Sequence, residues 1–436
     1  MNKLIVSVGL AALGASTLHA QYSPTVTPAE MAKPWSVAAS VRGFYDDNYL
    51  TLPSSAARST YGMEFSPSGS LNYSVNNTAI TASYVFDWRY YDASSTSDMS
   101  HQFKVNYNQS FSERAALQVG EAFVVAQNPT VIDPAITSTP LRTSGDNVHN
   151  TGSFSFTYGL TPKVDAQLSY ANDLYAYQQT FGDVYNPAGA AYTPSYSALL
   201  DRIDQLVTVN LNWKITDALT GVAGYSFGNT GYTSPEPIIF AGAPGAQSFS
   251  NPNNVFSQDR NNDAHYFFIG ADQQFSSQLN GSIRVGGQYL DYYNAHADDL
   301  SPYVEANVTW NYMEGSYAQA GVKHEHSATD VVGLSVGPGA QPVLDSETTA
   351  AYLSLSQTIT GGLTGGLLGQ FQHSAFNGGS LNGQSEDFFI VGLNTAYRFN
   401  DYLMAEAGYN WNKLVSDVSG RDYTRNMVYI GVRATY

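Results

Sequence analysis

The stretch NMVYIGVRATY, residues 426–436, alternates apolar and polar positions without a break. One face carries the apolar residues Val428, Ile430, Val432, Ala434 and Tyr436. Arg433 lies between them and belongs to the opposite face. A period of two residues is typical of a β-strand that has one face in an apolar environment and the other in water. The segment therefore predicts a strand that runs up to Tyr436.

The same two-residue period recurs along most of the chain. In the segment 79–91, for example, Ile80, Tyr84 and Trp88 share one face, whereas Asp87 and Arg89 lie on the other. The repeated segments predict about 18 strands, with 16 as the alternative count, each long enough for a tilted crossing of an outer membrane. Strands of this length are unusual in soluble β-sandwiches, where about five to six residues is common.

The composition agrees with an all-β chain. It contains 38 Gly, 32 Tyr and 21 Phe, and only 13% of its residues are charged. Such a mixture suits strands, turns and membrane interfaces better than helices. The chain has no cysteine, which excludes disulfides and thiol chemistry, and its net charge of −17 makes nucleic acid a poor partner.

The first residues are typical of an export signal. Lys3 provides a positive start, residues 4–13 are apolar, and small residues precede a cleavage site after Ala20. We therefore expect a signal peptide over residues 1–20, a periplasmic leader over 21–34 and a barrel over 35–436. No stretch is long and apolar enough for a membrane-spanning helix.

The connections between strands are of two kinds, and they alternate. Short turns are predicted at 76–78, 112–114, 161–163, 215–218, 276–278, 313–316, 360–362 and 400–401. Longer loops are predicted at 47–59, 92–99, 127–148, 178–200, 229–261, 294–301, 327–346, 377–386 and 415–424. This alternation predicts a transmembrane up-and-down antiparallel β-barrel with both termini on the short-turn side, which is the periplasmic side.

The signal peptide, the unbroken hairpins and the terminal aromatic of residues 426–436 resemble those of bacterial outer-membrane β-barrels, over about residues 35–436. Within that class the chain looks most like the "putative β-barrel porin" type of Gram-negative bacteria. The resemblance implies a location in the bacterial outer membrane, contact with its lipid, and passive diffusion of small hydrophilic solutes or ions. It also implies insertion by the barrel assembly machinery, which reads a C-terminal strand like Val428, Ile430, Val432, Ala434 and Tyr436. It leaves open both a monomer and a homo-oligomer.

The polar face of the strands would line the channel, because about 18 strands enclose an aqueous interior. The charged residues expected there are Arg42, Glu64, Asp87, Arg89, Lys104, Asp165, Asp272, Arg284, Glu305, Lys323, Arg398, Glu406 and Arg433. The two signs nearly balance. The acidic surplus falls in the longer loops, where it would attract cations to the mouth or would only keep the loops solvated and bind divalent cations.

Two local features stand out against this pattern. The loop 229–261 contains an apolar knot, Ile238, Ile239 and Phe240, which we expect to pack inside the barrel or against another protomer. In the segment 116–127, Glu121 falls on the apolar face, which predicts either a β-bulge or a different register there.

Catalytic motifs are not found in the sequence, which contains neither GxSxG nor HExxH. His324 and His326 share one side of a predicted strand, but no third ligand is identified, so we expect no metal and no cofactor. We therefore predict a channel rather than an enzyme. A structural or adhesive barrel without open conductance and, less favoured, an outer-membrane hydrolase with a Ser–His pair remain as alternatives.

Overall fold

The computed structural model describes residues 30, 33–126, 146–184, 194–241, 248–333 and 341–436. The expected signal peptide over residues 1–20 lies outside the described residues, as does most of the leader. The barrel strands are β1 (Trp35–Asp46), β2 (Thr60–Val75), β3 (Thr78–Tyr91), β4 (Thr96–Ser112), β5 (Ala115–Ala126), β6 (Asn147–Thr161), β7 (Val164–Tyr177), β8 (Arg202–Lys214), β9 (Leu219–Tyr232), β12 (Asn262–Gln274), β13 (Leu279–Tyr292), β14 (Ala297–Met313), β15 (Ser316–Ser327), β16 (Asp345–Thr358), β17 (Leu363–Asn377), β18 (Ser385–Asn400), β19 (Leu403–Ser416) and β20 (Tyr423–Thr435).

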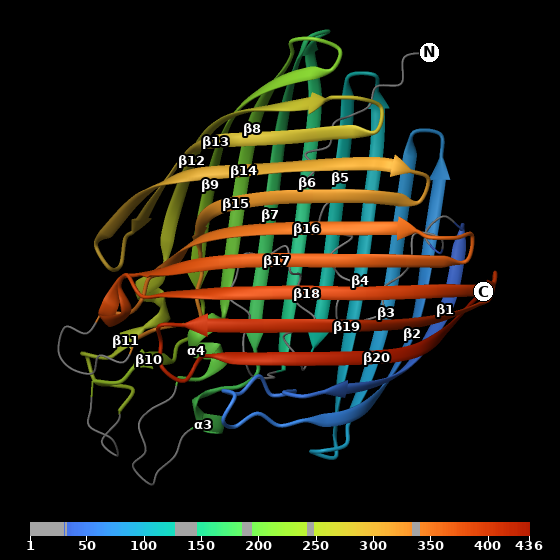
Figure 1. Cartoon of the computed structure of the whole chain (residues 1–436). Coiled ribbons are helices and arrows are strands. Elements are labelled where there is room, and N and C mark those ends of the chain that lie inside the picture. Colours follow the sequence, from blue (N-terminus) through green and yellow to red (C-terminus); the bar gives the residue numbers. More distant parts are fainter. Residues whose placement is uncertain (1–29, 31–32, 127–145, 185–193, 242–247, 334–340) are drawn as a thin grey trace.

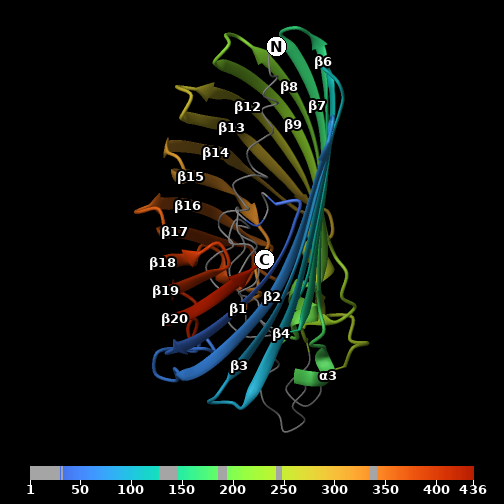
Figure 2. The ribbon, with the colours of Figure 1, turned by 90° about the vertical axis from the view of Figure 1, so that its right-hand side faces the viewer.

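These strands form one closed 18-stranded sheet in which each strand pairs antiparallel with its neighbours along the chain. The wall made by β12–β20 and the wall made by β1–β9 cross each other in Figure 1 and enclose the interior seen from the side in Figure 2. The predicted up-and-down antiparallel barrel of about 18 strands is confirmed.

The barrel closes between β1 and β20, where Val41 pairs with Val432. The pairing continues to the last residue, because Tyr436 N donates to Val37 O at 2.8 Å and Val37 N donates to Tyr436 O at 3.2 Å. The Tyr436 ring lies 5.6 Å from the Trp35 ring. The segment quoted above therefore forms the closing strand, and no strand edge is left unpaired at this seam.

The two ends of the barrel differ as the alternation of turns and loops predicts. The strand β1 begins at Trp35 and β20 ends at Thr435, and both of these residues lie at the short-turn end of the barrel. Two of the predicted loops, 92–99 and 294–301, were wrong in length, since only residues 92–95 and 293–296 separate the strands there. Ser95 and His296 adopt left-handed φ angles of 52°, which close these turns tightly.

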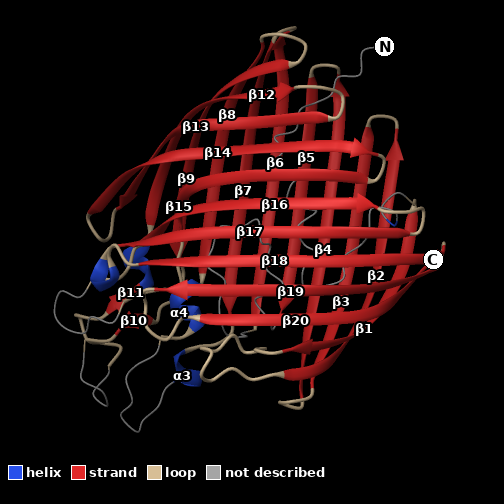
Figure 3. Ribbon diagram, in the orientation of Figure 1, coloured by secondary structure: helices blue, strands red, loops and turns tan. Residues whose placement is uncertain are grey.

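Short elements gather at the long-loop end, in the loops that follow β7, β9 and β17 (Figure 3). They are the helices α3 (Phe181–Val184) and α4 (Tyr196–Leu200), the hairpin β10 (Pro237–Ile239) with β11 (Val255–Phe256), and the 3₁₀ turns η3 (Ser257–Arg260) and η4 (Gly379–Leu381). Across the described part of the chain, every helix is too short or too polar to span a membrane.

The outer face of the barrel is apolar and exposed, as shown by Ile430, which is 70% exposed. Glu121 lies on this face. Neither expected irregularity occurs at Glu121, which pairs in regular register with Val105 and Gly152; the register shift between β4 and β5 lies at their turn, between Ser110 and Ser112. The carboxylate accepts a hydrogen bond from Asn150 Nδ2, and Gly152 leaves room beside it. A local polar partner therefore allows the charged residue to remain in register.

The β14–β15 ladder closes the wall but does not run along the whole length of β14. Their ladder ends where Val304 pairs with His324, although β14 continues to Ala297. Pro302 lies in this unpaired part of β14 and has no N–H to donate. The His326 N–H instead donates to the Gln288 side chain on β13, at 3.0 Å. The end of β15 therefore lies against the interior face of the β13–β14 hairpin.

Candidate functional site

The side chains on the interior face of the barrel are buried near the long loops and exposed near the short turns. Along β4, Ser100 and Gln102 are buried, whereas Asn106, Asn108 and Ser110 on the same face are exposed. The same gradient runs along the interior face of β18, where Glu386, Phe388, Ile390 and Gly392 are buried and the end of the strand is exposed. The interior is therefore narrowest in the half that lies under the loops, which we call the outer half.

Five of the predicted charged residues meet in the outer half and form an ion-pair chain: Asp87, Arg89, Glu64, Arg42 and Glu406. Arg42 Nε lies 2.6 Å from Glu406 Oε1, and its Nη1 lies 3.2 Å from Glu64 Oε1. Arg89 Nε donates to Glu64 Oε2 at 2.9 Å, and its Nη2 lies 3.7 Å from Asp87 Oδ2. The chain crosses β3, β2, β1 and β19, so it ties the closing seam together from inside.

Gly431 makes this arrangement sterically feasible. Arg42 on β1 must reach across β20 to meet Glu406 on β19, and it crosses β20 at Gly431. A Cβ at position 431 would lie 2.6 Å from Arg42 Cγ and 2.5 Å from the Val41 carbonyl oxygen. The Tyr429 ring lies 4.6 Å from the Arg42 guanidinium carbon and adds a cation–π contact.

Arg433 has a partner that the sequence did not suggest. Its Nε and Nη2 donate to the two carboxylate oxygens of Glu30 at 2.9 and 2.7 Å, and Thr435 Oγ1 donates to Glu30 Oε1 at 2.8 Å. Glu30 and Arg433 are both 2% exposed. Glu30 belongs to the segment expected to be a leader, which has no strand period that could have indicated this contact.

The other predicted residues form separate, more exposed pairs. Arg284 binds Asp272 at 2.8 Å, and Lys323 binds Glu325 at 2.6 Å. The remaining contacts are Glu305 Oε2 with the Tyr303 hydroxyl at 2.8 Å, Asp165 with Lys214 at 3.5 Å, and Arg398 with the Gly361 carbonyl at 3.2 Å. Lys104 lies half-buried on the interior face of β4. The pairs of Arg284, Lys323, Glu305, Asp165 and Arg398 lie outside the ion-pair chain.

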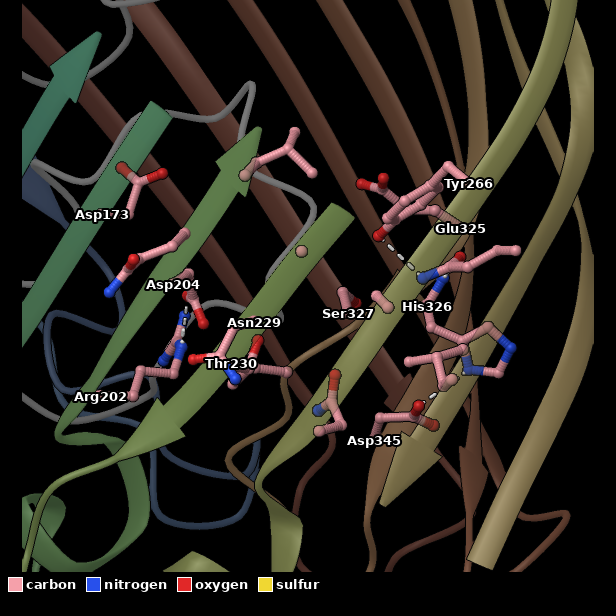
Figure 4. A pocket seen from close by; sticks show the side chains of 18 of the residues that line it. Asp173, Arg202, Asp204, Asn229, Thr230, Tyr266, Glu325, His326, Ser327 and Asp345 are labelled. Carbon is pink, nitrogen blue, oxygen red and sulfur yellow. Dashed lines mark hydrogen bonds and ion pairs between the residues drawn. The ribbon is translucent and has the colours of Figure 1, made fainter. Parts of the chain in front are cut away.

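A cavity of about 260 Å³ remains open in the outer half, opposite the ion-pair chain. It is bounded by residues of β7, β8, β9, β12 and β13 on one side and by the end of β15 and the start of β16 on the other. In Figure 4, Arg202 and Asp204 lie on the first side, and Glu325, His326 and Asp345 on the second. Arg202 and Asp204 were not among the predicted pore-lining residues, and the sequence gives no sign that they border a cavity.

The long loops pack over this cavity. Ile238, Ile239 and Phe240 are buried, and the two isoleucines form one apolar cluster with Tyr175, Leu199 and neighbouring residues. The apolar knot of loop 229–261 therefore packs within the chain, against α4 and the outer end of β7.

Two arginines form hydrogen bonds with the loop that follows β15. Arg260 Nη1 donates to the Thr329 carbonyl at 2.9 Å, and burial lowers the pKa of this guanidinium. Arg421 donates to both carboxylate oxygens of Asp330 at 3.0 and 2.9 Å, and to Glu386 at 3.1 Å. Burial alone would lower the pKa of Arg421, but the two carboxylates outweigh it and raise the pKa.

The mouth of the barrel carries less unpaired negative charge than its number of acidic residues suggests. Asp46 accepts from Arg425 at 2.8 Å, Asp330 and Glu386 are bound by Arg421, and Asp345 lies 2.8 Å from His326 Nδ1. Asp133, an acidic residue of the predicted loop 127–148, lies outside the described residues. The sequence cannot indicate which loop carboxylates will meet an arginine from another loop.

His324 and His326, which share one side of β15, each contact a different acidic residue of β16. His324 contacts Thr349 Oγ1 at 2.8 Å and Glu347 at 3.1 Å, and His326 contacts Asp345. In the described ranges, no group of three or more His, Asp or Glu side chains is placed to hold a metal ion.

Residues 223–436 match the model of the family described as "Putative beta-barrel porin 2". The matched segment begins within β9 and covers the second half of the barrel, and it confirms the resemblance to β-barrel porins. No curated protein matches the chain.

Three solved structures align with this chain over most of its length, at low identity and low TM-score. OccAB4 of Acinetobacter baumannii has 9% identity and a TM-score of 0.43, with 94% of this chain and 100% of that chain covered. OccK11 (OpdR) of Pseudomonas aeruginosa has 12% identity and a TM-score of 0.41, with coverages of 92% and 96%. The outer membrane protein opdK of Pseudomonas aeruginosa has 10% identity and a TM-score of 0.42, with coverages of 92% and 99%.

Proposed function

We propose that this chain, whose second half matches the β-barrel porin model, is a bacterial outer-membrane channel for passive diffusion of small hydrophilic solutes or ions. One observation carries the proposal: an 18-stranded barrel closes completely, its outer face is apolar, and its polar interior opens toward the short turns. Barrels of this size leave room for water inside.

Selection would be by size, because the interior narrows in the outer half. Solutes there meet charges that are already paired within the protein, as in the ion-pair chain, so neither sign dominates the wall. Paired charges of opposite sign orient water and polar solutes without trapping ions. The predicted pore-lining residues act in this way, as the wall of the passage.

The short-turn end would face the periplasm, which places the signal peptide and both barrel termini on the side from which such proteins insert. The barrel would contact outer-membrane lipid through its apolar face. The barrel assembly machinery would read the exposed side of β20, formed by Val428, Ile430, Val432, Ala434 and Tyr436. Assembly into a homo-oligomer stays open within this proposal.

The interior chemistry favours a channel over an enzyme. His149 Nε2 lies 3.2 Å from the Thr151 hydroxyl, the arrangement a hydrolase would use to activate a nucleophile. That hydroxyl, however, donates to Asp173 Oδ1 at 2.6 Å, so its proton is directed at a carboxylate instead of at the imidazole. The pair therefore has the geometry of a structural contact.

A second candidate function, a structural or adhesive barrel without open conductance, is favoured by the loop packing. The loops that follow β7, β9 and β15 share the apolar cluster and the Arg260 contacts. A tightly packed loop layer would close the outer mouth and present a fixed surface.

Swelling of proteoliposomes separates these functions. Vesicles that contain the purified barrel are diluted into isotonic arabinose, glucose or raffinose. A channel predicts swelling whose rate falls as the sugar becomes larger, and vesicles without protein provide the control. A barrel without conductance predicts no swelling in any sugar, and that result would overturn the proposed function.

A further inference from the structure

The chain folds back into the barrel just before β1 begins. Pro34 O accepts from Asn72 N at 2.8 Å and so continues the β1–β2 ladder by one step. Lys33 N donates to Glu30 O at 3.2 Å, which closes a turn. Beyond this turn the Glu30 carbonyl oxygen lies 3.5 Å from the Ser70 hydroxyl, which belongs to the interior face of β2. Glu30 is therefore inside the barrel and not below its rim.

The Glu30 carboxylate reaches deeper than the backbone of its own residue. Its two oxygens accept from the Arg433 guanidinium at 2.9 and 2.7 Å, and one of them also accepts from Thr435 Oγ1 at 2.8 Å. In the closing ladder Thr435 pairs with Ala38, and Arg433 pairs with Ser40. The carboxylate therefore lies several residues inside the barrel, beside the seam between β1 and β20.

The barrel wall beside Glu30 is built from small side chains. On the interior faces of β1 and β2, the cross-strand pairs are Ser36 with Ser70, Ala38 with Ser68, and Ser40 with Ser66. Arg433 Nη2 donates to Ser68 Oγ at 3.2 Å, so the arginine that holds Glu30 is itself held against this wall. Protein interiors are closely packed, and small side chains in one layer leave room for a further segment of chain to lie on it.

Burial on this wall departs from the gradient along β4 and β18, where interior side chains near the short turns are exposed. Ser36 is the second residue of β1 and lies at the short-turn end, yet it is 4% exposed. Its partner Ser70 is 6% exposed, and the two hydroxyls lie 2.7 Å apart. Glu30 contacts Ser70, so the chain before β1 covers this part of the wall.

We propose that the chain before β1, with Glu30, Lys33 and Pro34, is an internal strap that narrows the short-turn end of the passage and widens it when released. The pair of Glu30 with Arg433 is its lock. Release would expose both charged groups to water in the barrel, so neither would be left buried without a partner, which is the costly outcome. The inference rests on the proposed function, since a strap regulates passage only where solutes cross the barrel.

The chain has no cysteine, so one introduced thiol measures the position of the strap without background. Ser70→Cys places a thiol beneath Glu30, and Asn108→Cys places one on the exposed interior face of β4. A water-soluble methanethiosulfonate labels each purified variant in detergent, and mass spectrometry follows the rate. We expect Ser70→Cys to be labelled at least about tenfold more slowly than Asn108→Cys, because labelling follows the population in which the thiol is open to water.

Glu30→Ala removes the lock and should accelerate labelling of Ser70→Cys by about tenfold or more. The matched control is Glu314→Ala, which removes an exposed carboxylate from the short turn after β14, at the same end of the barrel. The exchanged pair, Glu30→Arg with Arg433→Glu, should restore slow labelling, which separates loss of the lock from a general loss of folding. In planar bilayers, Glu30→Ala should give a larger single-channel current step than the unaltered chain, and Glu314→Ala should not.

The outcomes are distinguishable. Labelling of Ser70→Cys as fast as that of Asn108→Cys, or unchanged by Glu30→Ala, would overturn the strap and leave the channel standing. Faster labelling in Glu30→Ala without a larger current step would show that the strap does not narrow the passage, and would overturn its regulatory role. Absence of current steps in every chain would overturn the proposed function and with it the regulation of passage, whatever the labelling rates.

Discussion

The ion-pair chain and the cavity lie in the same outer half of the barrel and use the same residue types, yet their packing differs. In the chain, Arg42 reaches over Gly431 and is held by two glutamates, so the space between the strands is filled. At the cavity, Arg202 lies flat on Tyr175 and binds one aspartate, so space remains in front of it. The charged residues alone therefore do not determine where a cavity forms. A cavity remains only where the side chains that pair with an arginine leave the space in front of it unfilled.

Arg42→Ala breaks the chain and should have the largest effect. Glu64 and Glu406 would remain buried without this cation, which typically costs about 3–5 kcal/mol of folding free energy. Unfolding in urea with lipid vesicles measures the loss. The control is Arg284→Ala, whose pair with Asp272 is more exposed and should contribute about 0–1 kcal/mol. Equal losses in both variants would contradict the special role of the chain.

Gly431→Val should come next in size. Its side chain would collide with Arg42 and with the backbone of Val41, so Arg42 would have to move away from Glu406. Overpacking of this kind costs about 1–3 kcal/mol. The same urea titration measures it. If the double variant Gly431→Val with Arg42→Ala lost the sum of the two single losses, the glycine would not act through Arg42.

Arg421→Ala tests the fastening of the loops over the cavity. Removing its bonds to Asp330 and Glu386 should lower the free energy of local opening by about 1.5–3 kcal/mol. Limited proteolysis of the loop segment 328–333 should become about tenfold faster or more, because cleavage follows the population of the open form. Unchanged cleavage would show that the apolar cluster alone holds the loops.

Ala171→Leu should have the smallest effect on stability. The cavity accepts the added carbons, so the free energy of unfolding should change by less than about 0.5 kcal/mol. Ala171→Leu and Gly431→Val both enlarge a small residue on the interior face, but only Ala171 borders a cavity. A loss as large as that of Gly431→Val would show that the cavity is filled in the folded protein.

Much of the barrel follows from the two-residue period, because alternation is a local property that each strand carries by itself. It identified the strands, the closing role of residues 426–436 and the faces of Arg42, Glu64 and Glu406. It missed the tight turns at Ser95 and His296, where polar residues near the strand ends still pair.

The site was less predictable, because its contacts join residues far apart in the chain. The bridge from Arg42 to Glu406 depends on the register of β1, β20 and β19 and on a glycine at their crossing. Glu30 lies in a segment with no strand period, and the Arg421 partners come from the loop after β15 and from the start of β18. Such contacts depend on how loops and strands meet in space, which local patterns do not encode.

The central claim is that the barrel encloses a continuous aqueous passage in spite of its filled outer half. Single-channel recording of the purified full chain in planar bilayers tests it most directly. We predict stepwise currents whose size rises in proportion to the potassium chloride concentration, with little preference between potassium and chloride because the interior charges are paired. Bilayers that contain inserted barrel and show no current steps at any salt concentration would contradict the claim.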